Sequence, residues 1–155
     1  MKREEKQPGA ISFFVPGAAK TAGSKIPGQT KSGKLYVRDD CAGSGNWKGV
    51  VATFALPHRP KPLLTGPLSM TCTFYMKRPK HHYVAGKYEK GLKALAQRYH
   101  IVVPDGLKLT RAIEDSLTGI IYHDDAQIAD EHIQKLYADE PGHIGVEIEI
   151  RKLKE

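Results

Sequence analysis

Strict alternation of side chains between Leu68 and Met76 is the feature that most constrains the fold. Apolar residues occupy every second position, and Ser, Thr and Tyr occupy the positions between them. Because successive side chains of a strand point to opposite faces, this period predicts a β-strand with one buried face. Residues 145–152 alternate in the same way, with Val146, Ile148 and Ile150 set against charged residues. That pattern predicts a second strand with one solvated face.

A helix is predicted from about Gly106 to Leu117, where apolar positions follow helical spacing. Its buried stripe is expected to consist of Leu109, Ala112, Ile113, Ser116 and Leu117. Lys108, Arg111, Glu114 and Asp115 fall on the other side, and so does Leu107. Asp105 precedes the first turn, where a carboxylate caps the helix and favours its positive end.

The other segments give weaker signals. A short strand is predicted at 11–15, and a helix from Asn46 to about Leu56 with Trp47, Val50, Val51 and Phe54 on its apolar face. Trp47 is interpreted as a core residue rather than a base-stacking platform.

Part of 88–99 is predicted to be helical, and 127–137 fits either a helix or a strand. His81 and His82 lack a third ligand at useful spacing, so we interpret them as solvated or phosphate-facing.

Length and composition indicate one domain that spans 1–155, with 1–9 as a charged flexible tail. No apolar run approaches the roughly 20 residues needed to cross a membrane. The N-terminus lacks the apolar region of a signal peptide, so a cytoplasmic location in a bacterial host is expected. Cys41 and Cys72 have no CxxC spacing, which favours reduced thiols.

An acidic island lies in this basic chain. From Asp105 to Glu131 there are two Lys/Arg against seven Asp/Glu, a local charge of −5. The whole chain carries +7, so the remainder carries +12. Metal-dependent phosphodiester chemistry requires two things. A basic surface holds the polyanion, and carboxylates hold a hard cation against one phosphate. Asp105, Asp124 and Asp125 are candidate ligands, and Lys108 or Arg111 could neutralise phosphate charge. Each of these residues also has a purely structural explanation. Asp105 could cap the helix, Asp124 and Asp125 could form a turn, and Arg111 with Glu114 and Asp115 could form a salt-bridged surface.

Two basic segments are candidates for contacting nucleic acid. Residues 17–46 form a long loop rich in Gly, Lys and Ser, with a hairpin predicted near Ser32-Gly33 and one arm at 34–38. Its candidate DNA contacts are Lys20, Lys25, Lys31, Lys34 and Arg38. A mobile, solvated loop is the equally weighted alternative. In the second segment, at 77–100, the candidate contacts are Lys77, Arg78 and Lys80.

The stretch PDGLKLTRAIEDSLTGIIYHDDAQI resembles the RusA family of Holliday-junction endonucleases, phage-type members especially. Asp105, Leu109 and Arg111 match its first motif, followed by Asp115-Ser116-Leu117 and by residues 124–128 (DDAQI). The resemblance implies a small α+β fold, a mixed β-sheet with helices on one side. It also implies a homodimer, paired nicks across branched DNA such as a four-way junction, and dependence on Mg²⁺, with Mn²⁺ as a substitute.

The same resemblance implies that Asp105 and Asp125 are metal ligands, with Asp124 beside them. Arg111 falls at the place of a catalytic basic residue that is usually Lys. Leu107 departs from the pattern because the family has a second Asp at this position. Three explanations stay open: Glu114 or Asp115 compensates, two carboxylates with water suffice, or the protein binds junctions and cuts them poorly. A basic RNA-binding or assembly protein is a further alternative.

Overall fold

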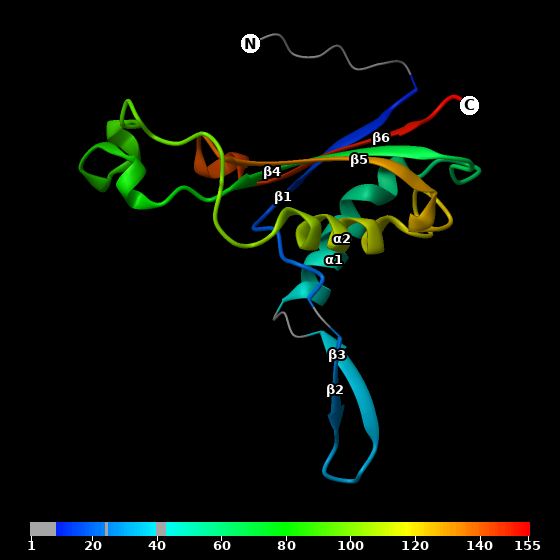
Figure 1. The fold of residues 1–155 in the computed structure, drawn as a ribbon. Coiled ribbons are helices and arrows are strands. Elements are labelled where there is room, and N and C mark those ends of the chain that lie inside the picture. The colour runs from blue at the N-terminus through cyan, green and yellow to red at the C-terminus, as the bar shows by residue number, and fades with distance from the viewer. Residues whose placement is uncertain (1–8, 24, 40–42) are drawn as a thin grey trace.

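The computed structural model describes residues 9–23, 25–39 and 43–155, so most of the predicted tail and Cys41 lie outside the described residues. A four-stranded sheet has the order β1-β6-β4-β5 (Figure 1). Its strands are β1 (Ile11–Pro16), β4 (Leu68–Met76), β5 (Ile128–Tyr137) and β6 (Gly145–Lys152). β6 pairs antiparallel with β1 and β4, whereas β4 and β5 are parallel.

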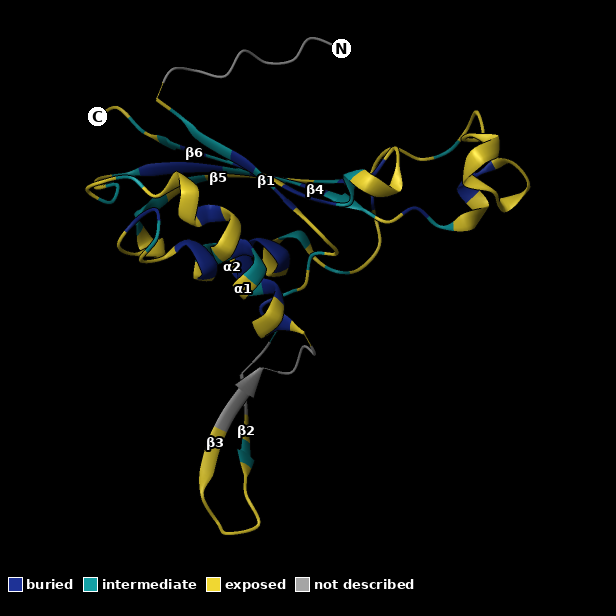
Figure 2. Cartoon of the chain, turned by 180° about the vertical axis from the view of Figure 1, so that it is seen from behind, coloured by how far each residue is buried: buried dark blue, intermediate teal, exposed yellow. Residues whose placement is uncertain are grey.

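The alternation of β4 and β6 determines which sheet face is buried. Leu68, Met70, Cys72 and Phe74 have no exposed surface, and neither have Ile148 and Ile150 beside them. α1 (Ser44–Ala55) and α2 (Gly106–Leu117) cover this face, and Figure 2 shows both helices on one side of the sheet. The predicted α+β fold, with helices on one side of a mixed sheet, is confirmed.

The boundaries and buried stripe of α2 agree with the prediction, but α1 differs in its start and its buried face. α1 begins at Ser44, two residues before Asn46, after Gly43 turns the chain with a φ of 82°. Trp47 is 4% exposed, which confirms its core role, yet Phe54 is 41% exposed and Ala55 is fully buried. The predicted place of Phe54 is therefore wrong, because α1 turns its Trp47–Val51–Ala55 side to the core.

The predicted hairpin is confirmed as β2 (Lys25–Gln29) paired antiparallel with β3 (Leu35–Asp39). The Thr30 N–H donates to Lys34 O at 2.9 Å, and Gly33 takes a φ of 85° that favours glycine. In Figure 1 this hairpin projects away from the sheet, beyond the helices. Lys31 and Lys34 of the hairpin are therefore presented to solvent, outside the folded core.

The predicted helix near 88–99 is wrong. The segment after β4 contains only short 3₁₀ turns: η2 (Lys80–His82), η3 (Val84–Gly86) and η4 (Tyr88–Lys90). Gly91 has a φ of 80°, which ends helical geometry, and Leu95 is 95% exposed, so a helix there would have no stripe to bury. Backbone bonds instead cross the segment, from Val84 N–H to Gly91 O and from Lys93 N–H to His82 O.

Residues 128–137, which the sequence left open, form strand β5 at the edge of the sheet. A register shift lies at its start, where Ile128 pairs with Leu68 but Asp130 pairs with Ser69. The extra residue, Ala129, interrupts the two-residue period, and most of the strand is partly exposed on both faces. Among the described residues, no helix is long and apolar enough to span a membrane.

Candidate active site

Helix α2 lies against the edge strand β5, and this contact brings the acidic island together. A Cβ added at Gly106 would lie 3.0 Å from Ile133 Cγ2, so the start of the helix approaches the middle of the strand closely. The chain then turns through η5 (Asp125–Gln127) directly into β5. Glu114 of the helix, Asp125 of the turn and Glu131 of the strand are therefore near enough to interact electrostatically.

Asp105 occupies the cap position of α2, but its side chain makes no capping hydrogen bond. The prediction that its carboxylate caps the helix is therefore wrong. The side chain is exposed and its backbone carbonyl accepts the Leu109 N–H at 3.1 Å. The Asp105 carboxylate is thus available to bind a ligand next to the positive end of the helix.

Asp124 has a local role that Asp125 does not share. Asp124 Oδ1 accepts the Ala126 N–H at 2.8 Å, while Gln127 Oε1 accepts the Asp124 N–H at 3.1 Å. This reciprocal capping box fixes the turn that leads into β5. Asp125 is the next residue, and it is exposed. The turn thus uses the Asp124 carboxylate to position Asp125.

Glu114 is the most perturbed carboxyl group of the described residues. Burial raises its pKa to about 7, with further contributions from the charges of Glu131 and Asp125, a hydrogen bond to Glu131 and the charge of Asp115. Burial and the neighbouring carboxylates disfavour the ionised form of Glu114, so this side chain holds its proton more tightly than an exposed glutamate does. Glu114 lies on α2 and Glu131 on β5, so their approach depends on helix–strand packing.

Glu131 is the site residue that sequence reasoning missed. Compensation for Leu107 by Glu114 or Asp115 was one of three explanations left open, but no role was predicted for Glu131. Its position could be derived only if 128–137 were known to be a strand beside α2. The alternation signal that would have shown this is interrupted at Ala129.

The remaining predicted residues of α2 lie on its exposed side. Leu107 is 71% exposed, which confirms that it lies off the buried stripe, and Lys108 and Arg111 are exposed too. Asp115 forms an ion pair with Lys48 of α1, with 2.8 Å between Oδ2 and Nζ. The structure therefore joins Asp115 to the neighbouring helix, and its predicted role as a metal ligand stays a prediction.

These carboxylates are the type of donor that a hard divalent cation prefers, although the described residues do not form a complete metal cage. Glu114, Asp125 and Glu131 supply carboxylate oxygens, the ligands that Mg²⁺ prefers, and their mutual repulsion is what a bound cation relieves. Within the described part of the chain, no three His, Cys, Asp or Glu side chains are arranged to hold a metal ion. A cation here would keep several waters, as Mg²⁺ commonly does.

The predicted DNA contacts divide between the hairpin region and the segment after β4. Lys20, Lys31 and Lys34 are exposed, and Lys25 and Arg38 lie on the two hairpin strands. Lys77 and Lys80 are exposed as well. These cations remain candidate phosphate contacts.

Arg78 differs from its basic neighbours because it is buried. Its guanidinium donates to Ala138 O at 2.9 Å and to Gln97 O at 2.7 Å, and it stacks over the Tyr137 ring at 5.4 Å. Asp139 lies 3.5 Å from the same group. Arg78 thus joins the segment after β4 to the end of β5.

His82 is also buried, so its predicted solvated or phosphate-facing role is wrong. Its Nδ1 lies 3.3 Å from Arg78 Nη1, and its ring meets the Tyr137 ring edge-on at 4.8 Å. Burial lowers its pKa, and the nearby charges of His81, Arg78 and Lys93 lower it further. His81 is exposed as predicted.

The fold and these residues define a small α+β protein with clustered carboxylates at a helix–strand contact and a largely basic exterior. Residues 19–151 match the family described as Endodeoxyribonuclease RusA, so the chain belongs to this family. Membership implies a metal-dependent nuclease of the Holliday-junction resolvase type. The chain is also 35% identical over 144 residues to the uncharacterized protein YqaN of Bacillus subtilis (strain 168), covering 92% of this chain and 96% of the relative.

Proposed function

We propose that this protein is a Mg²⁺-dependent, structure-selective endodeoxyribonuclease that nicks four-way junctions or other branched DNA as a homodimer. The biological setting would be recombination, repair or replication in a phage or prophage. The observation that carries the proposal is the match of residues 19–151 to a nuclease family. It is supported by the net charge of +7 and by Glu114, whose pKa is raised by burial and by the nearby charges of Glu131 and Asp125. Mn²⁺ is expected to substitute for Mg²⁺.

The proposed division of labour follows from position. Asp125 and Asp105 are the ligands that the family resemblance implies. Glu114 and Glu131 supply the negative charge that Leu107 lacks. When bound, the cation would polarise the scissile phosphate and lower the pKa of bound water. Arg111 and Lys108, exposed on the same helix, would neutralise charge that develops on the phosphate oxygens. Arg111 would do so without acting as a base, since its guanidinium stays protonated.

Cleavage of a labelled four-way junction by the wild type and by Asp125→Asn tests the proposal. We expect paired symmetric nicks with Mg²⁺ or Mn²⁺, none with EDTA, and a large loss in Asp125→Asn. Glu147→Gln is a matched control, because it removes one carboxylate charge from an exposed position on β6. If Asp125→Asn cuts as fast as the wild type, the assigned site is wrong.

A second candidate function is junction binding without efficient cleavage, favoured by the exposed leucine at position 107. It predicts tight, salt-sensitive binding of the junction with no nicks in either metal. Comparable affinity for duplex RNA would instead favour a general basic nucleic-acid binder. The nuclease proposal requires a preference for the DNA junction, because branch geometry must align two sites.

A further inference from the structure

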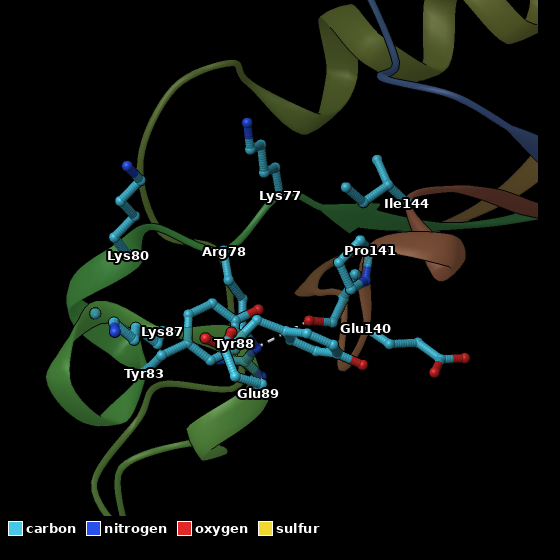
Figure 3. Close-up of a pocket in the computed structure, with 12 residues that line it drawn as sticks. Lys77, Arg78, Lys80, Tyr83, Lys87, Tyr88, Glu89, Glu140, Pro141 and Ile144 are labelled. Atoms are coloured by element: carbon cyan, nitrogen blue, oxygen red, sulfur yellow. Dashed lines mark hydrogen bonds between the residues drawn. The ribbon is translucent and has the colours of Figure 1, made fainter.

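A cavity of about 310 Å³ lies beyond the ends of the parallel strands β4 and β5 (Figure 3). One wall comes from residues 77–89 and the other from residues 138–144. The walls are tied together where Arg78 Nε donates to Ala138 O at 2.9 Å and Ala138 N–H donates to Met76 O at 2.9 Å. The cavity is therefore built by the fold rather than by a loose loop.

Two tyrosines line this cavity. Tyr83 is 8% exposed and Tyr88 is 47% exposed, and their rings meet edge-on at 5.6 Å with an angle of 85°. Pro141 and Ile144 belong to the other wall, and Figure 3 shows them across from the tyrosine side. A buried ring that holds a half-exposed ring in place makes a fixed aromatic surface, suited to stacking a planar group.

Cationic side chains also line this cavity. Lys77, Lys80 and Lys87 line the cavity and are exposed, and in Figure 3 the ammonium groups of Lys77 and Lys80 lie on one side of the tyrosine rings. Glu89 and Glu140 also line it, but the basic residues outnumber them. Over 77–100 the chain has seven Lys/Arg against one Glu. The rim therefore favours an anionic ligand with a planar apolar part.

We propose that this cavity, the tyrosine pocket, binds one unpaired nucleotide of a DNA strand. The base would stack on Tyr88 and the flanking phosphates would contact Lys77, Lys80 and Lys87. Aromatic platforms beside a basic rim are how proteins hold single strands without reading their sequence. The inference rests on the proposed function in taking DNA as the ligand, since a branch point exposes unpaired nucleotides.

The size and place of the pocket support one nucleotide at a site separate from the carboxylates. Its volume is at the lower end of the range of small-molecule sites, roughly 300–1,000 Å³, which suits one base rather than a base pair. The carboxylate Asp125 precedes β5, whereas Ala138 follows it. At about 3.3 Å per residue, the strand between them spans roughly 30 Å. The pocket would hold the DNA far from the bond that is cut.

The test measures binding in EDTA, so that no DNA is cut. Fluorescence anisotropy would compare a labelled single strand of 20 nucleotides with a duplex of the same sequence, for the wild type, Tyr88→Ala and Tyr88→Phe. Tyr99→Ala is the matched control, because Tyr99 is 54% exposed and lies outside the pocket lining. A 2-aminopurine within the strand reports stacking by loss of its fluorescence.

We expect Tyr88→Ala to bind the single strand roughly fivefold to 150-fold more weakly, the range for loss of one stacked base. Duplex binding should be unchanged, Tyr88→Phe and Tyr99→Ala should behave as the wild type, and 2-aminopurine should be quenched except in Tyr88→Ala. The nucleotide-binding proposal is wrong if Tyr88→Ala binds the single strand as tightly as the wild type. It is also wrong if Tyr88→Ala and Tyr99→Ala lose the same amount of affinity. The same conclusion follows if deoxyadenosine monophosphate binds as tightly as the strand.

The two proposals can fail separately. If the wild type binds the strand through Tyr88 but cuts no junction in Mg²⁺ or Mn²⁺, the nuclease proposal is wrong and the nucleotide-binding proposal is supported. If the wild type cuts junctions while Tyr88→Ala binds single strands as tightly as the wild type, the nucleotide-binding proposal is wrong and the nuclease proposal is supported.

Discussion

At the scale of single residues, Glu114 links the pH dependence of stability to the candidate active site. Its pKa of about 7 in the folded protein lies above the ordinary 4.5. The folded state therefore binds this proton more tightly than the unfolded chain does. The resulting stabilisation is complete below pH 4.5 and is lost as the pH rises through 7.

We therefore expect Glu114→Gln to gain stability relative to the wild type as the pH rises from 5 to 8. Since Glu114 is partly exposed and screened by solvent, the gain should be about 1 kcal/mol, well under the full value of the shift. Urea unfolding in EDTA at both pH values measures it. Glu147→Gln should show no such gain between pH 5 and 8. If Glu114→Gln differs from the wild type by the same amount at pH 5 and at pH 8, the prediction is wrong.

Leu107→Asp tests whether this position has lost a ligand. Leu107 is 71% exposed, so the substitution should change the free energy of unfolding by less than about 0.5 kcal/mol. We expect Mg²⁺-dependent junction cleavage to rise by roughly tenfold, equivalent to about 1.4 kcal/mol of barrier, because one more carboxylate can hold the cation. Leu107→Asn, which has no charge, should not raise the rate. A loss of activity in Leu107→Asp would instead show that the leucine side chain makes a useful contact.

Arg78 and Lys77 are neighbours in sequence with different expected roles. Arg78→Met would leave the carbonyls of Gln97 and Ala138 without their donor, so we expect a loss of about 2–4 kcal/mol in urea unfolding. Lys77→Met should cost less than about 0.5 kcal/mol but weaken DNA binding. Equal destabilisation by the two substitutions would refute this distinction.

At the scale of elements, the β2–β3 hairpin is the part best placed to track a DNA backbone. We expect Lys31→Gln with Lys34→Gln to reduce the slope of log affinity against log salt by roughly one unit per lost phosphate contact. Titrations at several salt concentrations measure the slope. Lys154→Gln, an exposed change near the C-terminus, is the control. An unchanged slope in the double variant would mean that the hairpin does not contact DNA.

The elements that sequence reasoning located well are those whose pattern is uninterrupted. β4, β6 and α2 have strict periodicity because each presents one face to the same core. The helix predicted near 88–99 failed because Gly91 takes a φ of 80° and because the backbone carbonyls of Gln97 and Arg98 bond to Arg78 and to Tyr137 of β5 instead of within a helix. β5 was left open because Ala129, His132, Ile133, Leu136 and Tyr137 also have helical spacing. The extra residue at Ala129 additionally interrupts the two-residue period that marks a strand.

At the scale of the whole molecule, paired nicks require two active sites related by a two-fold axis. We expect sedimentation to give twice the 17.2 kDa mass of the chain, and the two nicks to lie symmetrically across the junction. A monomer that still cuts symmetrically would contradict the proposed dimer. Cleavage of only one strand by a dimer would contradict the two-site arrangement.

The sequence by itself determined the strands and helices with regular periods, the acidic island in a basic chain, and the family motif around Asp105 and Asp125. These are local properties of composition and spacing. Only the tertiary structure decided that Glu131 meets Glu114, that Arg78 is buried, and that Tyr83 and Tyr88 line a pocket with residues from 138–144. Each depends on how strand β5 pairs with β4 and packs on α2, and that pairing joins residues too far apart in the chain for any local pattern to specify.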